Sequence, residues 1–226
     1  MGGKDSIIVD ADANLDAAVE GVAQAAFGFQ GQKCSACSRA IVDEKIYDVF
    51  LERLKDRVSK ITVGEPTENK AMGPVVSEGA MKSILNYIEI GKKEGRLIHG
   101  GGVAKDAGDG YFIQPTVIAD IAPTARIAQE EIFGPVLSII AYKDEEEAVR
   151  IANDSPYGLA GAVWSKDEGR AQKVARRIRA GQVDVNGGAF NMNAPFGGFK
   201  QSGHGREAGI YGLEEFLEYK SLQLKG

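Results

Sequence analysis

The feature that most constrains this fold is a regular alternation of short apolar runs with helical patterns. Apolar runs typical of strands occupy residues 6–10, 39–43, 96–101, 114–120, 136–142, 158–165 and 181–187. Between them, apolar residues recur at helical spacing over 14–27, 45–59, 81–95, 144–154 and 167–180. Strands that alternate with helices predict an α/β domain built around a largely parallel sheet with flanking helices.

Two segments break this alternation. Residues 186–207, "NGGAFNMNAPFGGFKQSGHGRE", are rich in glycine and follow neither a helical nor a strand period. A stretch of this length without regular structure is typical of a functional loop. Residues 208–226 predict a short helix and then an exposed strand with Leu222 and Leu224 on one face. Because no hairpin partner accompanies this strand, we expect it to pair with another chain.

Charge and composition exclude several classes of partner. The net charge of -5 argues against nucleic acid or an anionic membrane as the main partner. No apolar run approaches the ~20 residues that span a bilayer, and the start of the chain lacks the pattern of a secretory leader. Two cysteines cannot build a disulfide framework. We therefore expect a reducing, cytoplasmic compartment.

The two cysteines stand together in "FGFQGQKCSACSRA", residues 27–40. A thioredoxin-like motif would follow a strand and open a helix, whereas here a helix precedes the pair and a strand follows it. A zinc site needs about four ligands, of which one C-x-x-C supplies only two. The pattern therefore predicts no metal site.

Cys34 has the surroundings of a reactive thiol. Gly31 allows the backbone to approach a ligand closely, and Lys33 and Arg39 add the positive charge that stabilises a thiolate. Cys37 lies just before a strand that we expect to be buried, which is typical of an inert core cysteine. We therefore interpret Cys34 as the nucleophile and Cys37 as its neighbour. Cys37 is also a candidate oxidation partner for Cys34.

Five segments of the chain resemble the aldehyde dehydrogenase superfamily, in the family's order. They are "MGGKDSIIVDADANLDAA", "GQKCSACSR", "QEEIFGPVLSI", "NDSPYGLAGAVWS" and "APFGGFKQSGHGRE". The stretches around Cys34, "YIEIGKKEGRLI" and "GYFIQPTV" are most similar to the pyrroline-carboxylate dehydrogenases, which oxidise glutamate semialdehyde. The loop "NGGAFNMNAPFGG" lacks the pattern with which that branch holds the substrate carboxylate. The resemblance therefore does not identify which aldehyde is the substrate.

The resemblance implies an NAD(P)-dependent oxidation of an aldehyde to a carboxylic acid. Cys34 would attack the carbonyl carbon to form a thiohemiacetal, and loss of hydride to NAD or NADP would leave a thioester for water to hydrolyse. Glu131 would bind the nicotinamide ribose hydroxyls, and Phe133 would pack beside the ring. The alternative for Glu131 is a solvated surface acid. The choice between NAD and NADP stays open.

Two further residues receive roles through the same resemblance. Glu207, in "GRE", would help the general base to exchange protons, with an ion pair to Arg206 or Lys200 as the alternative. Phe196 and its loop would lie near the substrate entrance. Glycines in this loop can be required by backbone geometry alone. The prediction therefore applies to the loop as a whole more than to any single residue in it.

The resemblance also places important groups outside these residues. The family's general base stands immediately before the segment that begins here at Met1, and its nucleotide-binding domain precedes that base. We therefore expect residues 1–207 to be a catalytic domain, residues 208–226 a helix and oligomerisation strand of a homo-oligomer, and the chain alone to be inactive as a dehydrogenase. The alternatives are a non-catalytic α/β interaction module with a vestigial thiol, and a redox switch of Cys34 with Cys37.

Overall fold

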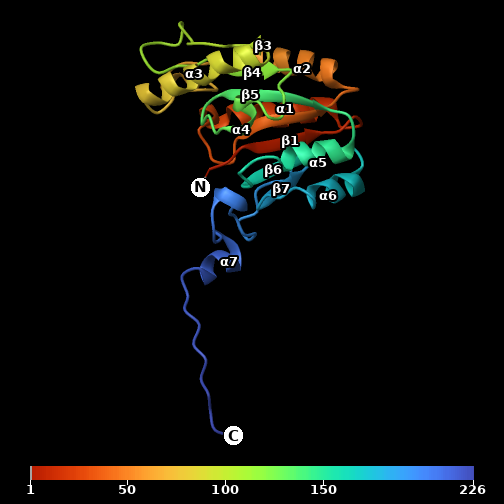
Figure 1. The fold of residues 1–226 in the computed structure, drawn as a ribbon. Helices are drawn as coiled ribbons and strands as arrows, with labels where there is room; N and C mark the ends of the chain where they lie inside the picture. The colour runs from red at the N-terminus through yellow and green to blue at the C-terminus, as the bar shows by residue number, and fades with distance from the viewer. Residues whose placement is uncertain (1) are drawn as a thin grey trace.

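Seven strands form a single sheet in the computed structural model, which describes residues 2–226 (Figure 1). The strands lie in the order β3-β4-β5-β2-β1-β6-β7, and every neighbouring pair is parallel except β3 with β4. The prediction of a largely parallel sheet is confirmed. The strands are β1 (Asp5–Val9), β2 (Cys37–Asp43), β3 (Arg96–His99), β4 (Thr116–Ala119), β5 (Val136–Tyr142), β6 (Ala160–Trp164) and β7 (Gln182–Val185).

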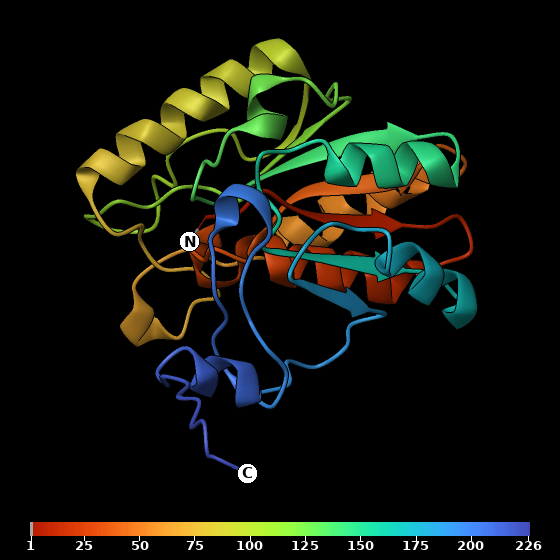
Figure 2. The ribbon, with the colours of Figure 1, turned by 60° about the horizontal axis from the view of Figure 1, so that its bottom comes forward.

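Helices cover both faces of the sheet, because successive side chains of a strand point to opposite sides. On β1, Ile7 and Val9 pack in the core under α1 (Leu15–Phe27) and α2 (Tyr47–Ser59). Ile8, between them, packs in the opposite core. Figure 2 shows the resulting layers. The opposite core is covered by α3 (Glu78–Glu94), α4 (Arg126–Gln129), α5 (Glu145–Asn153) and α6 (Glu168–Ala175).

Local sequence accounts for some helix ends but not for all of them. The side chain of Asn14 accepts a hydrogen bond from Ala17 N at the start of α1, and Gly95 ends α3. The predicted helix over 167–180 instead ends at Ala175. There the Asn153 side chain bonds the backbone of the next turn, donating to Arg177 O and accepting from Arg179 N. This contact from α5 replaces the helical bonds that would continue α6.

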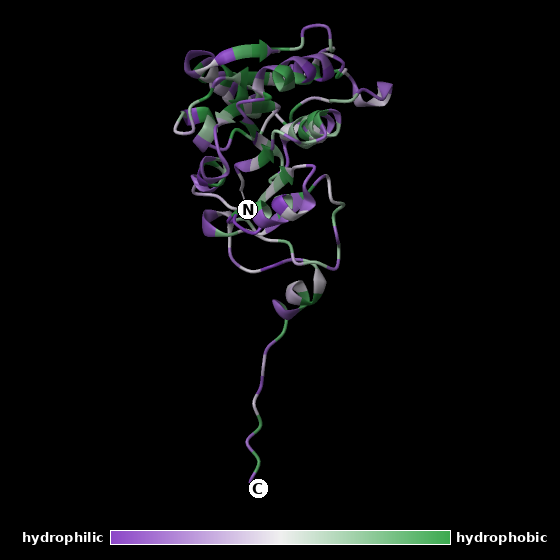
Figure 3. Ribbon diagram, turned by 90° about the vertical axis from the view of Figure 1, so that its right-hand side faces the viewer, coloured by the Kyte–Doolittle hydropathy of each residue, from purple (hydrophilic) through white to green (hydrophobic). Residues whose placement is uncertain are grey.

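The C-terminal segment leaves the sheet domain. After α7 (Gly209–Glu214), residues 217–226 have no regular secondary structure and extend away from the body of the molecule (Figure 1). Apolar residues alternate with polar ones along this tail (Figure 3). The oligomerisation strand stays a prediction, since its pairing needs a second chain. Among residues 2–226, no helix is both long enough and apolar enough to cross a bilayer.

Candidate active site

The loop that carries Cys34 has an unusual backbone. The 3₁₀ turn η1 (Gly28–Gly31) contains three consecutive residues with positive φ: Phe29 at 55°, Gln30 at 57° and Gly31 at 65°. Positive φ costs a residue with a side chain of the order of 1–3 kcal/mol, and such strain clusters at functional sites. A turn closed by a hydrogen bond from Ala36 N to Lys33 O then presents Cys34, which is half-buried.

Close backbone contacts join this loop to two other segments. Gly31 lies so near Gly134 that a side-chain carbon on Gly31 would overlap the Gly134 carbonyl. A side-chain carbon on Gly3 would likewise overlap the carbonyl oxygen of Cys34. Gly3 N also donates to Glu131 Oε1 over 3.0 Å. Residues 2–3 therefore connect the Cys34 loop with the segment of Glu131.

Glu131 and Phe133 present complementary groups at this junction. The structure shows no hydrogen bond to Glu131 Oε2 within residues 2–226, while Oε1 is held by Gly3. Phe133 has a φ of 55° and keeps 46% of its surface exposed. The half-buried carboxylate is anchored by a defined bond, so the alternative of a freely solvated surface acid does not describe Glu131.

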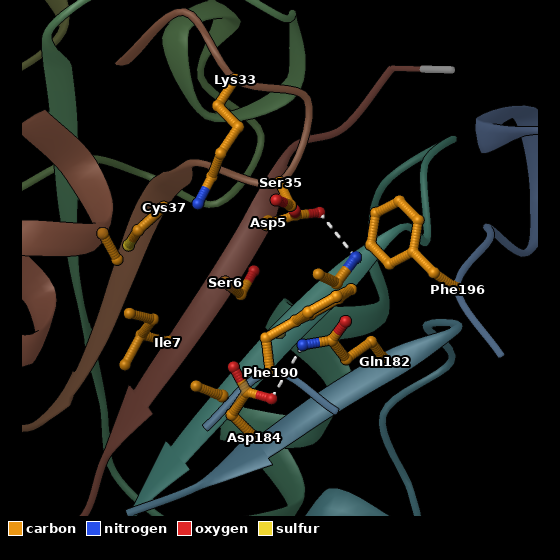
Figure 4. Close-up of a pocket in the computed structure, with 14 residues that line it drawn as sticks. Asp5, Ser6, Ile7, Lys33, Ser35, Cys37, Gln182, Asp184, Phe190 and Phe196 are labelled. Atoms are coloured by element: carbon orange, nitrogen blue, oxygen red, sulfur yellow. Dashed lines mark hydrogen bonds between the residues drawn. The ribbon is translucent and has the colours of Figure 1, made fainter. Parts of the chain in front are cut away.

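A cavity of about 350 Å³ opens at the edge of the sheet where β1, β2, β6 and β7 begin (Figure 4). We call it the amino-edge cavity. Lys33 and Ser35 line it from either side of Cys34, and Cys34 itself is not among the lining residues. Phe190 and Phe196 form its aromatic wall, with ring centroids 6.0 Å apart in an edge-to-face arrangement. The structure thus places Phe196 in a cavity beside the Cys34 loop.

Several polar residues of this cavity, including Asp5, Gln182 and Asp184, were not predicted from the sequence. Asp5 comes from β1, and Gln182 and Asp184 come from β7, where the amide of Gln182 donates to Asp184. Asp5 accepts from Ala160 N, and burial raises its pKa to about 8. An acid at the start of a buried strand is the one signal in the sequence that identifies Asp5 as unusual.

The backbone of Glu207 lies beside the backbone of Phe196. The two residues exchange hydrogen bonds in an isolated antiparallel bridge, with both N···O distances at 2.6 Å. The alternative of an ion pair does not hold for the described residues. Arg206 Nη1 donates to Gly198 O and Gly205 O, and Lys200 Nζ donates to Asn153 O and Ser155 O. The exposed Glu207 carboxylate is thereby left available.

Cys37 and Arg39 have structural roles. Cys37 is 4% exposed, and burial raises the pKa of its thiol to about 12, as expected for a core cysteine. Arg39 was expected to add charge near the nucleophile. Instead its guanidinium is fully buried and donates to the carbonyl oxygens of Lys4, Ile151, Ala152 and Asp154. It fastens β1 and β2 to the end of α5.

Across residues 2–226, no group of three or more histidine, cysteine or acidic side chains is arranged to hold a metal ion. The site is therefore described by a half-buried thiol on a strained loop, an anchored carboxylate and an exposed aromatic ring. Together with the three-layer α/β fold, these features define an α/β protein with a free, half-buried cysteine at its candidate site.

The chain belongs to the aldehyde dehydrogenase family. The family model described as "Aldehyde dehydrogenase family" matches residues 1–222. A 1-pyrroline-5-carboxylate dehydrogenase of Geobacillus thermodenitrificans is 48% identical over 213 residues, which are 92% of this chain and 41% of that protein. The human mitochondrial aldehyde dehydrogenase is also 48% identical, over 100% of this chain and 44% of its own length.

The fold agrees with this family. The crystal structure of an aldehyde dehydrogenase C mutant from Pseudomonas syringae, complexed with NAD⁺ and octanal, superposes with a TM-score of 0.93. It is 41% identical, and the match covers 96% of this chain and 45% of that one. The chain thus spans less than half the length of these relatives.

Proposed function

We propose that this chain is the catalytic half of an NAD(P)-dependent aldehyde dehydrogenase, with Cys34 as its nucleophile. The observation that carries the proposal is the position of Cys34. It is half-buried on a strained loop, it is bounded by two residues that line a cavity, and its carbonyl contacts the segment that anchors Glu131. In this mechanism the Cys34 thiolate bonds to the aldehyde carbon, giving a thiohemiacetal and later a thioester.

The residues present fit a nicotinamide ribose beside Cys34. A ribose offers two hydroxyl donors, and Glu131 Oε2 is a carboxylate oxygen without a partner in residues 2–226. Phe133 supplies exposed apolar surface for a ring. When bound, NAD or NADP would accept the hydride that the substrate carbon loses. Glu131 and Phe133 would hold and orient the cofactor.

Proton transfer requires groups beyond those described so far. We propose that Glu207 relays protons at the rim of the amino-edge cavity, because its exposed carboxylate is free of the neighbouring cations. We further propose that the general base and the nucleotide-binding domain lie outside these 226 residues. The chain's coverage of 41–44% of its curated relatives supports this division. Residues 1–207 would then be the catalytic domain, and residues 208–226 would join subunits of a homo-oligomer in a reducing cytoplasm.

The proposed substrate is an aldehyde small enough for the amino-edge cavity. The aromatic wall of Phe190 and Phe196 favours an apolar portion, and Lys33 offers one cation to an anionic group. Figure 4 shows the Lys33 amine turned inward, above Ser6 and Cys37. Relatives named for both 1-pyrroline-5-carboxylate and general aldehydes are equally identical to the chain, so the proposal extends to the aldehyde class only.

The test is acyl transfer to the thiol. With p-nitrophenyl acetate, the Cys34 thiolate displaces p-nitrophenolate and retains the acetyl group as a thioester. We expect one acetyl group per chain, located at Cys34 by mass spectrometry, and no NADH formation from aldehydes by the isolated chain. Cys34→Ala should abolish labelling, whereas Cys37→Ala should retain it.

Equal labelling of Cys34 and Cys37, or labelling that persists in Cys34→Ala, would contradict a dedicated nucleophile and favour the interaction-module alternative. The redox switch requires reversible oxidation of the Cys34–Cys37 pair. The structure offers it no support, because both cysteines are free and Cys37 is buried with a raised thiol pKa.

A further inference from the structure

A second cavity of about 260 Å³ lies at the opposite edge of the sheet, where β1, β2, β5 and β6 end. We call it the carboxyl-edge cavity. Ile8 and Val163 of the sheet, with Ala148, Ala171 and Val174 of the covering helices, form its apolar lining. The proposed dehydrogenase mechanism uses none of its residues, since the amino-edge cavity lies at the other end of the same strands.

The connections of the strands make this position a natural binding crevice. From β1 the chain passes through α1 on one face to β2, and from β6 it passes through α6 on the other face to β7. β1 and β6 are neighbours, so their connections diverge and leave a crevice beyond their carboxyl ends. Open α/β sheets bind ligands at such a switch point. Asp10 follows β1 and Ser165 follows β6 at the cavity.

Part of the polar lining already forms ion pairs and hydrogen bonds with other residues of the protein. The Arg170 guanidinium forms ion pairs with Asp10 and Asp12. The Ser165 hydroxyl lies 2.9 Å from oxygens of both acids. Glu145 is paired with Arg177 over 2.9 Å. These ion pairs compensate most of the charge on this part of the lining.

The remaining charged residues of the lining form no ion pair within the described residues, and one of them, Asp144, caps α5 by accepting from Glu147 N. Asp43 is only 6% exposed, and one of its oxygens accepts from Lys45 N over 2.9 Å. The structure shows no partner for its other oxygen. At the mouth, the exposed amines of Lys45 and Lys143 form no ion pair with a described carboxylate. This oxygen of Asp43 is not fully shielded from solvent, so it is available to a donor or a cation that enters the cavity.

We propose that the carboxyl-edge cavity binds a free apolar α-amino acid. Its ammonium group would donate to Asp43, its carboxylate would face Lys45 and Lys143, and its side chain would lie on Ile8 and Val163. The charge pattern carries the choice: Asp43 inside and Lys45 and Lys143 at the mouth complement a zwitterion, while the carboxylate of Asp144, also at the mouth, accepts from Glu147 N at the start of α5. The cavity volume of about 260 Å³ accommodates a molecule of this size.

The test is amide NMR of the isotopically labelled chain during titration with millimolar L-leucine. We expect shift changes centred on residues 8–10, 43–45, 142–145 and 163–165. N-acetyl-L-leucine, which lacks the ammonium group, should not bind. Asp43→Asn keeps the oxygen that accepts from Lys45 N and removes the charge, so affinity should fall about tenfold or more. Glu44→Gln is the matched control, since the adjacent, exposed Glu44 does not line the cavity.

The mouth is tested separately. Lys143→Met should weaken L-leucine binding and leave binding of L-leucinamide, which lacks the carboxylate, unchanged. The proposal is overturned if L-leucine produces no shifts, or if N-acetyl-L-leucine binds as well as L-leucine. It is also overturned if ammonium chloride alone reproduces the L-leucine shifts, which would indicate an inorganic cation site. Shifts centred on the amino-edge cavity would overturn it as well.

Discussion

Arg39 shows how one buried residue can hold several elements together. Its guanidinium donates to four backbone carbonyls, from Lys4 and from the end of α5. We expect Arg39→Met to lower the free energy of unfolding by about 3 kcal/mol or more, because buried acceptors would lose their donors. Arg53→Met is the control, since its ion pair with Asp16 is exposed and worth at most about 1 kcal/mol. Urea unfolding of both variants measures the two losses of stability. Similar losses would contradict the inference that Arg39 holds these elements together.

Two neighbouring residues should make stability depend on pH. Burial raises the pKa of Asp5 from 3.8 to about 8 and lowers that of Lys4 from 10.5 to about 7. From pH 3.8 to about 8 the folded chain retains a proton on Asp5 that the unfolded chain releases, so stability falls as pH rises. Above about pH 7 the unfolded chain binds a proton on Lys4 that the folded chain lacks, so stability rises with pH.

The two contributions predict a minimum of stability at about pH 7 to 8. Each has a slope of at most about 1.4 kcal/mol per pH unit. Urea unfolding below pH 9 avoids the titration of Cys37 in the unfolded chain. Asp5→Asn should remove the fall on the acidic side, and Lys4→Met should remove the rise on the basic side. An unchanged pH profile in both variants would show that neither group titrates in these windows.

At the scale of an element, the strained turn η1 positions the loop that carries Cys34. We expect Gly31→Ala to cost about 1–3 kcal/mol, because φ is 65° and the added carbon would overlap the Gly134 carbonyl. Gly28→Ala is the matched control, since nothing lies within 4 Å of its added carbon and its φ is -55°. It should be neutral or stabilise by up to about 1 kcal/mol. Thermal unfolding and the rate of Cys34 alkylation report both effects; equal behaviour of the two variants would argue against a rigid turn.

Elements were more predictable from the sequence than the site was. The seven strands of the sheet depend on local pattern, and the structure confirms them. The end of α6 depends on a side chain of another helix, Asn153, and local pattern carries no trace of it. Asp5 and Gln182 meet at one cavity only because β1 and β7 both flank β6. Such proximity follows from strand order, which periodicity does not determine.

For the whole molecule, the C-terminal tail is the unpartnered part of the structure. Phe216, Tyr219, Leu222 and Leu224 are each at least 77% exposed, although large apolar side chains favour burial. Leu222 and Leu224 share one face of an extended chain, as a pairing strand requires. We therefore expect the chain to self-associate through residues 217–226, with a concentration-dependent mass in light scattering.

A single charge tests which face of the tail is used. Leu222→Asp should weaken self-association at least about tenfold, because a carboxylate would be buried without a partner. Gln223→Asp adds the same charge on the opposite face and should have little effect. Neither change should alter thermal unfolding, since no side-chain hydrogen bond joins residues 217–226 to the sheet domain in the described chain. If both variants associate like the parent, the tail's apolar face does not hold subunits together, and the contact must lie on the sheet domain itself.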